Sequence, residues 1–190
     1  MIKRPGRFWV ILFGVCFGLA STAQTPTHRD ALVYYSLIAS QVKDLVPKTR
    51  LIWGHVQSNL HAAAESNPFR PNRSEIQMIK TAYEQNVRDL EKGIRSVSAL
   101  AETDPEIDLK QVVVRYLTGI KQAEESALPK IILLLETGVN KINDQQTAML
   151  KGFLHKGREL QSDLQRIEVL MATYQQKYAI TPEEQKNVLW

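Results

Sequence analysis

Apolar residues recur at alternating intervals of three and four positions along most of this 190-residue chain. This spacing places them on one side of an α-helix, which has about 3.6 residues per turn. The four stripes run over residues 31–63, 76–100, 109–134 and 150–178. No stretch alternates apolar and polar residues for long enough to indicate a β-strand. The pattern therefore predicts an all-α protein with four long amphipathic helices.

Short polar segments separate the stripes and carry helix stop and start signals. Two prolines between residues 67 and 72 end the first helix, because proline cannot continue a helical hydrogen-bond ladder. Ser74 with Gln77 matches a capping box for the second helix, and Thr103 with Glu106 matches one for the third. We therefore expect helix starts at both places.

Helices of this length joined by short loops fold back on one another as antiparallel neighbours. We therefore predict an antiparallel up-and-down four-helix bundle over residues 24–180 and a C-terminal tail over residues 181–190. The tail has the residues for one more helical turn, starting at Thr181. Pro47 and Pro129 lie inside the first and third stripes, so we expect a kink or a short break near each.

Residues 1–23 have the composition of a cleaved secretory signal peptide. Three basic residues precede an apolar run, and small residues end at Ala23, where cleavage would leave Gln24 first. The apolar run is shorter than the roughly 20 residues that a membrane-spanning helix needs. We expect export to the periplasm, the cell surface or the medium, and an uncleaved N-terminal anchor is the alternative.

Cys16 is the only cysteine and lies in the apolar run of the leader. Cleavage would leave a chain without disulfides or cysteine-bound metal, and lipidation of Cys16 is the alternative. Loss of Lys3, Arg4 and Arg7 lowers the formal net charge from +4 to +1. The mature chain then lacks the positive charge of a nucleic-acid-binding protein, and we expect no transmembrane segment in it.

The sequence lacks the common catalytic and cofactor motifs. It has no Glu-x-x-His for a di-iron centre, no His-Glu-x-x-His for zinc and no Cys-x-x-Cys-His for haem. It also has no Walker loop for phosphate and no Gly-x-Ser-x-Gly nucleophile elbow. We therefore predict a protein without enzymatic activity or cofactor that acts by binding or scaffolding.

Two histidine–glutamate pairs are candidate metal ligands. His61 and Glu65 are four residues apart, as are His155 and Glu159, so each pair shares one helix face. The end of the first helix and the start of the fourth meet at one end of the predicted bundle. The two pairs could therefore bind a divalent metal ion together. The competing interpretation is solvated helix surface, because His155 lies off the apolar stripe.

Gly119 and Gly157 indicate a second candidate site in the bundle core. Glycine inside a helix costs roughly 1 kcal/mol relative to alanine, so it usually has a packing reason. Close approach of two helix backbones is one interpretation, and a cavity for a small apolar ligand is the other. We expect Trp53 to lie at the edge of the core and Tyr34 to be partly exposed.

The leader, the paired long helices and the ending Met-Ala-Thr-Tyr-Gln-Gln-Lys-Tyr at residues 171–178 resemble an uncharacterised family of exported bacterial surface proteins built as helical bundles. The likeness extends over about residues 30–180 and implies an envelope location without catalytic residues. We therefore predict an exported envelope protein that binds or scaffolds an unknown protein partner, as a monomer or homodimer. The alternative is a carrier of a small ligand or metal ion.

Overall fold

The computed structural model describes residues 26–65, 72–137 and 144–188, and within these ranges all regular secondary structure is helical, without a β-strand. The helices are α1 (His28–Glu65), α2 (Arg73–Ser98), α3 (Leu109–Thr137), α4 (Asp144–Lys177) and α5 (Pro182–Val188). The all-α prediction is thereby confirmed for this part of the chain. The expected leader, with Cys16, lies outside the described residues.

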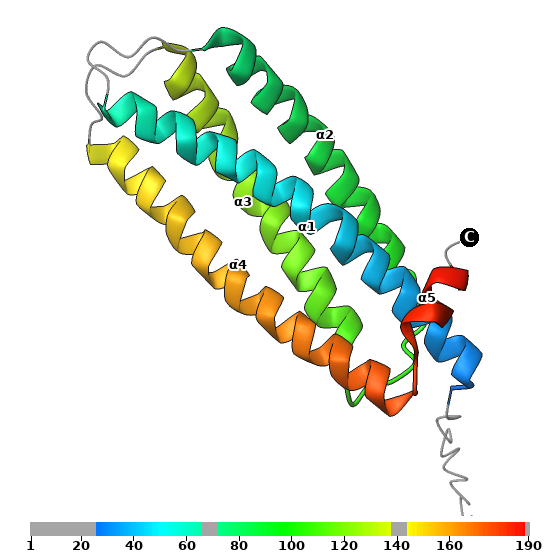
Figure 1. The fold of residues 1–190 in the computed structure, drawn as a ribbon. Helices are drawn as coiled ribbons and strands as arrows, with labels where there is room; N and C mark the ends of the chain where they lie inside the picture. The colour runs from blue at the N-terminus through cyan, green and yellow to red at the C-terminus, as the bar shows by residue number, and fades with distance from the viewer. Residues whose placement is uncertain (1–25, 66–71, 138–143, 189–190) are drawn as a thin grey trace, which may run out of the picture.

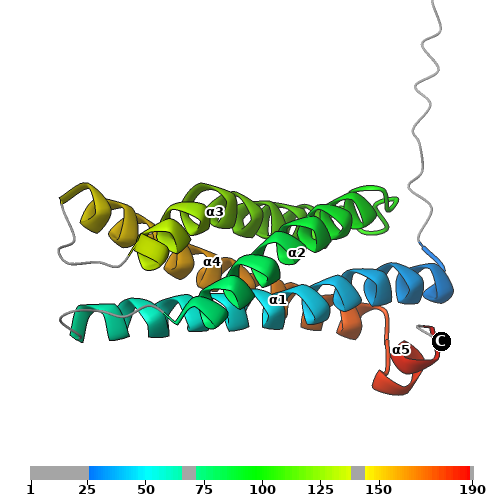
Figure 2. The same ribbon diagram turned by 90° about the horizontal axis from the view of Figure 1, so that it is seen from above.

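The four long helices lie side by side and run in alternating directions along the molecule (Figure 1). α3 packs against α1, α2 and α4, whereas the short α5 packs against α1 (Figure 2). A search of the described helices for an apolar stretch long enough to cross a membrane found none.

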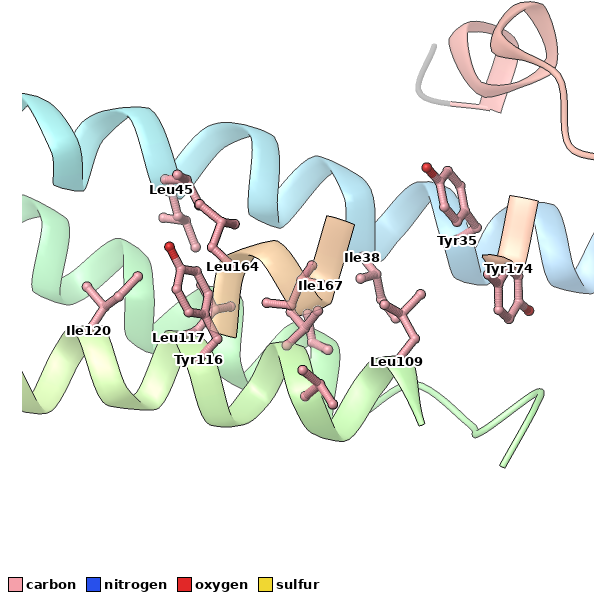
Figure 3. Close-up of a cluster of buried hydrophobic side chains, with 14 of the residues drawn as sticks. Tyr35, Ile38, Leu45, Leu109, Tyr116, Leu117, Ile120, Leu164, Ile167 and Tyr174 are labelled. Atoms are coloured by element: carbon pink, nitrogen blue, oxygen red, sulfur yellow. The ribbon is translucent and has the colours of Figure 1, made fainter. Parts of the chain in front are cut away.

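Two clusters of buried side chains form the core, and they follow the apolar stripes. The cluster nearer α5 includes Ile38, Leu117 and Ile167, which are fully buried (Figure 3). The cluster toward the other end includes Ile79 and Ile131. Burying a side chain of this size stabilises a fold by roughly 1.5–3 kcal/mol, so the stripes account for most of the packing between helices.

Pro47 and Pro129 lie inside α1 and α3, and both helices continue through them. The short break that we considered at each proline is therefore wrong. Both prolines are exposed, as are Lys43 and Glu125 four residues earlier. Proline removes the hydrogen bond to the carbonyl of that earlier residue, and at an exposed site water can replace it.

The predicted start of the second helix is wrong by two residues. α2 begins at Arg73, and its N-cap is Asn72, whose side-chain oxygen accepts a hydrogen bond from the Glu75 amide at 3.2 Å. Ser74 and Gln77 therefore lie inside the helix. Asparagine is as good an N-cap as serine, so the helix can start two residues earlier, after Asn72.

The predicted start of the third helix is also wrong. α3 begins at Leu109, and the preceding turn contains Asp108 with a φ of 54°. The Thr103 hydroxyl lies 2.6 Å from the hydroxyl of Tyr174 in α4. Thr103 thus links the loop to α4 instead of capping α3.

The tail folds back onto α1 and forms the predicted extra helix. The chain reverses at Ala179, whose φ is 50°, and α5 then starts with a capping box in which Thr181 and Glu184 each accept a hydrogen bond from the other's amide. His28 of α1 holds this segment: Nδ1 lies 2.9 Å from the Tyr178 carbonyl and Nε2 lies 2.9 Å from Glu184 Oε1. We call these contacts the α5 latch.

Asp104 is a buried carboxylate at this end of the molecule, with 4% of its surface exposed. It accepts hydrogen bonds from Lys177 at 2.7 Å, from the Tyr178 hydroxyl at 3.1 Å and from the Glu106 amide at 3.2 Å. Burial alone would raise the pKa of Asp104, but these three donors together hold it below the usual range. Asp104 thus joins the loop before α3 to the end of α4.

Tyr34 is buried with 3% of its surface exposed, so the prediction of partial exposure is wrong. Its ring centroid lies 5.4 Å from that of Tyr174, and its hydroxyl donates a hydrogen bond to Glu102 at 2.7 Å. A tyrosine ring can be buried when its hydroxyl has a partner. The loop before α3 supplies that partner, which the helical pattern does not show.

Candidate functional site

A groove of about 570 Å³ lies between α1 and α4, with α3 contributing to its floor. Ligand pockets in proteins commonly enclose roughly 300–1,000 Å³, so this volume suits a small molecule. Its lining is mainly apolar, with a few polar side chains. The lining residues are Val46, Thr49, Arg50, Trp53, Gly54, Gln57, Tyr116, Ile120, Phe153, Leu154, Gly157, Arg158, Leu160 and Gln161.

Two glycines line this groove, one on each wall. A Cβ atom on Gly54 of α1 would meet nothing within 4 Å, so the space above it is open. A Cβ atom on Gly157 of α4 would lie 3.1 Å from Cζ3 of the Trp53 ring. Gly157 therefore makes room for a side chain from α1. The Trp53 ring fills the space above Gly157, and no backbone atom of another helix lies within 4 Å of that Cβ position, so Gly157 lines the groove without widening it and without bringing two backbones into contact.

Gly119 packs against a side chain in the core and does not line the groove. A Cβ atom there would lie 2.9 Å from Cδ2 of Leu160 in α4. Gly119 therefore accepts this leucine side chain. Of the two glycines that the sequence singled out, only Gly157 belongs to the site.

Trp53 forms the boundary between the groove and a buried polar cluster. It is half-buried, as predicted for the edge of the core, and its ring lies 4.7 Å from that of Phe153 in α4. The indole Nε1 donates a hydrogen bond to Glu124 Oε1 of α3 at 3.1 Å. One side chain thus touches the groove and a carboxyl group behind it.

Glu124 is fully buried and is held by amide and indole donors, and no basic side chain of the described residues forms an ion pair with it. Asn86 Nδ2 of α2 lies 3.0 and 3.1 Å from its two carboxyl oxygens and also donates to Thr49 Oγ1 of α1 at 3.0 Å. Burial raises the pKa of Glu124 to about 7, against the opposing effect of the hydrogen bonds from Asn86 and Trp53. The Asn86 Oδ1 atom is buried without a hydrogen-bond partner.

The sequence analysis missed Asn86 and Glu124, although their positions carried a signal. Glu124 follows Ile120 by four residues, and Asn86 precedes Leu90 by four, so both occupy the apolar stripes of their helices. A polar residue on a buried stripe needs hydrogen-bond partners. Two such residues on neighbouring helices could have been predicted to meet.

Arg50 of α1 and Arg158 of α4 provide the positive charge of the groove. Both are exposed, and neither forms an ion pair with another side chain in the described part of the molecule. Burial raises the pKa of Tyr116, which also lines the groove, to about 12, and the charge of Arg50 acts in the opposite direction. The groove lining contains no aspartate or glutamate.

The structure places His61, His155 and Glu159 on the surface. His155 is exposed as predicted, and its Nε2 atom lies 3.3 Å from Glu159 Oε1, while Lys156 holds the pKa of Glu159 below its usual range. His61 is exposed, and the side chain of Glu65 lies outside the described residues. Among the described side chains, no three His, Cys, Asp or Glu residues lie close enough to hold a metal ion. A site completed by Glu65 stays a prediction.

Comparison of the chain with protein-family models, with curated proteins and with solved structures found no match. The resemblance to exported bacterial surface proteins therefore stays a prediction.

Proposed function

We propose that this protein is an exported, non-catalytic binding protein. In this proposal α1–α4 form an antiparallel up-and-down four-helix bundle, with bends at Pro47 and Pro129, and the groove between α1 and α4 holds a small apolar ligand. The observation that carries the proposal is the groove itself, which is open above Gly54 and is lined mainly by apolar side chains.

The chemistry of the lining supports binding over catalysis. None of the lining residues is a histidine, cysteine, aspartate or glutamate, which are the usual nucleophiles and general acids or bases. Tyr116 has a pKa raised to about 12 by burial, so its hydroxyl stays protonated at neutral pH. What the groove offers a ligand is apolar surface and hydrogen bonds.

The cellular location in this proposal comes from the leader at residues 1–23. Its basic start, apolar run and small residues before Gln24 favour cleavage and export to the periplasm or the cell surface. A chain without cysteine after that cleavage depends on core packing for stability, and the two buried clusters provide such packing.

Gly54→Leu tests the proposal with Nile red, a neutral apolar dye that fluoresces in apolar surroundings. A Cβ atom at this groove-lining position meets nothing within 4 Å, so a leucine side chain has room there, and leucine is a better helix former than glycine. We expect the variant to fold with at least the stability of the original protein and to bind Nile red at least tenfold more weakly.

Gly152→Leu is the matched control. Gly152 also lies in a helix, and a Cβ atom there meets nothing within 4 Å, but it does not line the groove. This variant should bind Nile red as the original protein does. If the original protein does not bind the dye, or if both leucine variants bind it unchanged, the proposed function is wrong.

A further inference from the structure

We propose that the natural ligand of the groove is a single-chain amphiphile with an anionic headgroup, such as a carboxylate or a sulfate. This inference rests on the proposed function and specifies the class of its ligand. Its basis is the placement of Arg50 and Arg158 on opposite walls of an apolar groove that contains no acidic side chain.

The two arginines supply a site for an anion. A guanidinium presents a planar set of N–H donors that matches the oxygens of a carboxylate, sulfate or phosphate. Neither Arg50 nor Arg158 forms an ion pair with another described side chain. Other basic residues of these helices, such as Lys43 and Arg166, also form no ion pair with a described side chain, so what sets Arg50 and Arg158 apart is their place in the groove lining. An anion between α1 and α4 would therefore find donors from both walls.

The floor of the groove supplies a site for a hydrocarbon chain. Ile120, Phe153 and Leu160 are buried core residues whose surfaces also line the groove, and Leu154 adds an exposed apolar side chain at the rim. An apolar tail packed on this floor would remove Leu154 and the half-buried Trp53 from water, which favours binding in proportion to the area covered. A volume of about 570 Å³ suits one chain of moderate length better than a two-chain lipid.

Calorimetric titrations with three ligands of equal chain length test the charge preference. Decanoate is the anion, decyltrimethylammonium the cation and decanol the neutral alcohol, each used below the concentration at which it forms micelles. We expect decanoate to bind at least tenfold more tightly than the cation at about pH 8, where a carboxyl group of ordinary pKa is ionised. Equal affinity for the anion and the cation would overturn the proposal.

The double variant Arg50→Gln with Arg158→Gln tests the two residues. We expect it to weaken decanoate binding about tenfold, because it removes both charged donors that would face the headgroup. Arg166→Gln is the matched control, since it removes one exposed arginine of α4 that does not line the groove. Equal losses in the control and the double variant would contradict a local role for the two arginines.

A series from octanoate to dodecanoate separates recognition of the tail from recognition of the headgroup alone. Each added methylene should strengthen binding by about fourfold while the groove has room, which corresponds to roughly 0.8 kcal/mol per buried CH₂. Inorganic phosphate should compete poorly, and competition as strong as that of decanoate would show an anion site without a tail site. Nile red binding separates the two proposals: if the dye binds and the amphiphiles show no charge preference, only the ligand class is wrong.

Discussion

Asp104 at the α5 end and Glu124 in the middle of the helices are both buried carboxyl groups, yet their pKa values move in opposite directions. The pKa of Asp104 is held below its usual range, whereas that of Glu124 is raised to about 7. Their side chains are similarly buried, with 4% and 0% of the residue surface exposed. Surface exposure therefore does not separate the two groups, but Glu124 lies deeper below the surface than Asp104, so burial raises its pKa more strongly.

The hydrogen-bond partners of the two carboxyl groups differ as well. Asp104 has a full positive charge from Lys177 at 2.7 Å and two further donors. Glu124 has neutral donors, the Asn86 amide and the Trp53 indole. Neutral hydrogen bonds recover part of the cost of burying a charge, and an opposite charge recovers more. The surroundings of Asp104 thus favour its ionised form, whereas those of Glu124 favour its protonated form.

Of the substitutions that test this comparison, Glu124→Gln should have the largest effect on the free energy of unfolding. The folded state holds the Glu124 proton more tightly than the unfolded chain does, so this group stabilises the fold below about pH 4.5 and loses that contribution as the pH rises through about 7. The shift corresponds to about 3 kcal/mol. We expect Glu124→Gln to remove this pH dependence of the free energy of unfolding, measured by denaturant titration at several pH values.

Glu125→Gln is the control for that experiment, because it removes the neighbouring exposed carboxylate, which pairs with Lys121. It should change stability by less than about 1 kcal/mol and should keep the pH dependence of the original protein. If Glu124→Gln loses stability at alkaline pH as the original protein does, Glu124 is ionised at little cost and the contrast with Asp104 is wrong.

Asp104→Asn should have a smaller effect on stability. The pH dependence that it removes has the opposite sign to that of Glu124. The folded pKa of Asp104 lies below its usual value, so its stabilisation is present above about pH 4 and is lost as the pH falls through the folded pKa. Asparagine keeps the size of the side chain but loses the charge that faces Lys177. We expect a loss of about 2 kcal/mol at neutral pH, measured by denaturant titration, and a neutral result would show that Lys177 contributes little.

His28→Ala should have the smallest effect, confined to the α5 latch. The contacts of His28 with Glu184 and with the Tyr178 carbonyl raise its pKa, so the latch is strongest below about pH 6.5 and weakens as the pH rises through the raised pKa. We expect lower hydrogen-exchange protection factors for the α5 amides in the variant, with the amides of α3 unchanged. The control variant is Lys186→Ala, which changes another residue of α5. It should leave the protection factors of the α5 amides unchanged.

Much of the fold could be predicted from the spacing of apolar residues, because that spacing selects the buried side of each helix. Ile38, Ile120 and Ile167 all belong to predicted stripes and are all buried. Helix starts were less predictable, since Asn72 and Ser74 are both good caps and only the structure shows which one is used. The groove was predictable only through Gly157, which the sequence singled out for a packing reason.

The sequence by itself determined that the described chain is helical and which side of each helix is buried, because both depend on residues a few positions apart. Only the tertiary structure decided that Trp53, Asn86 and Glu124 meet, since they come from three helices. It also decided that α1 and α4 leave a groove between Gly54 and Gly157. Rotation and register between helices depend on how all their side chains interlock, and no local spacing encodes that.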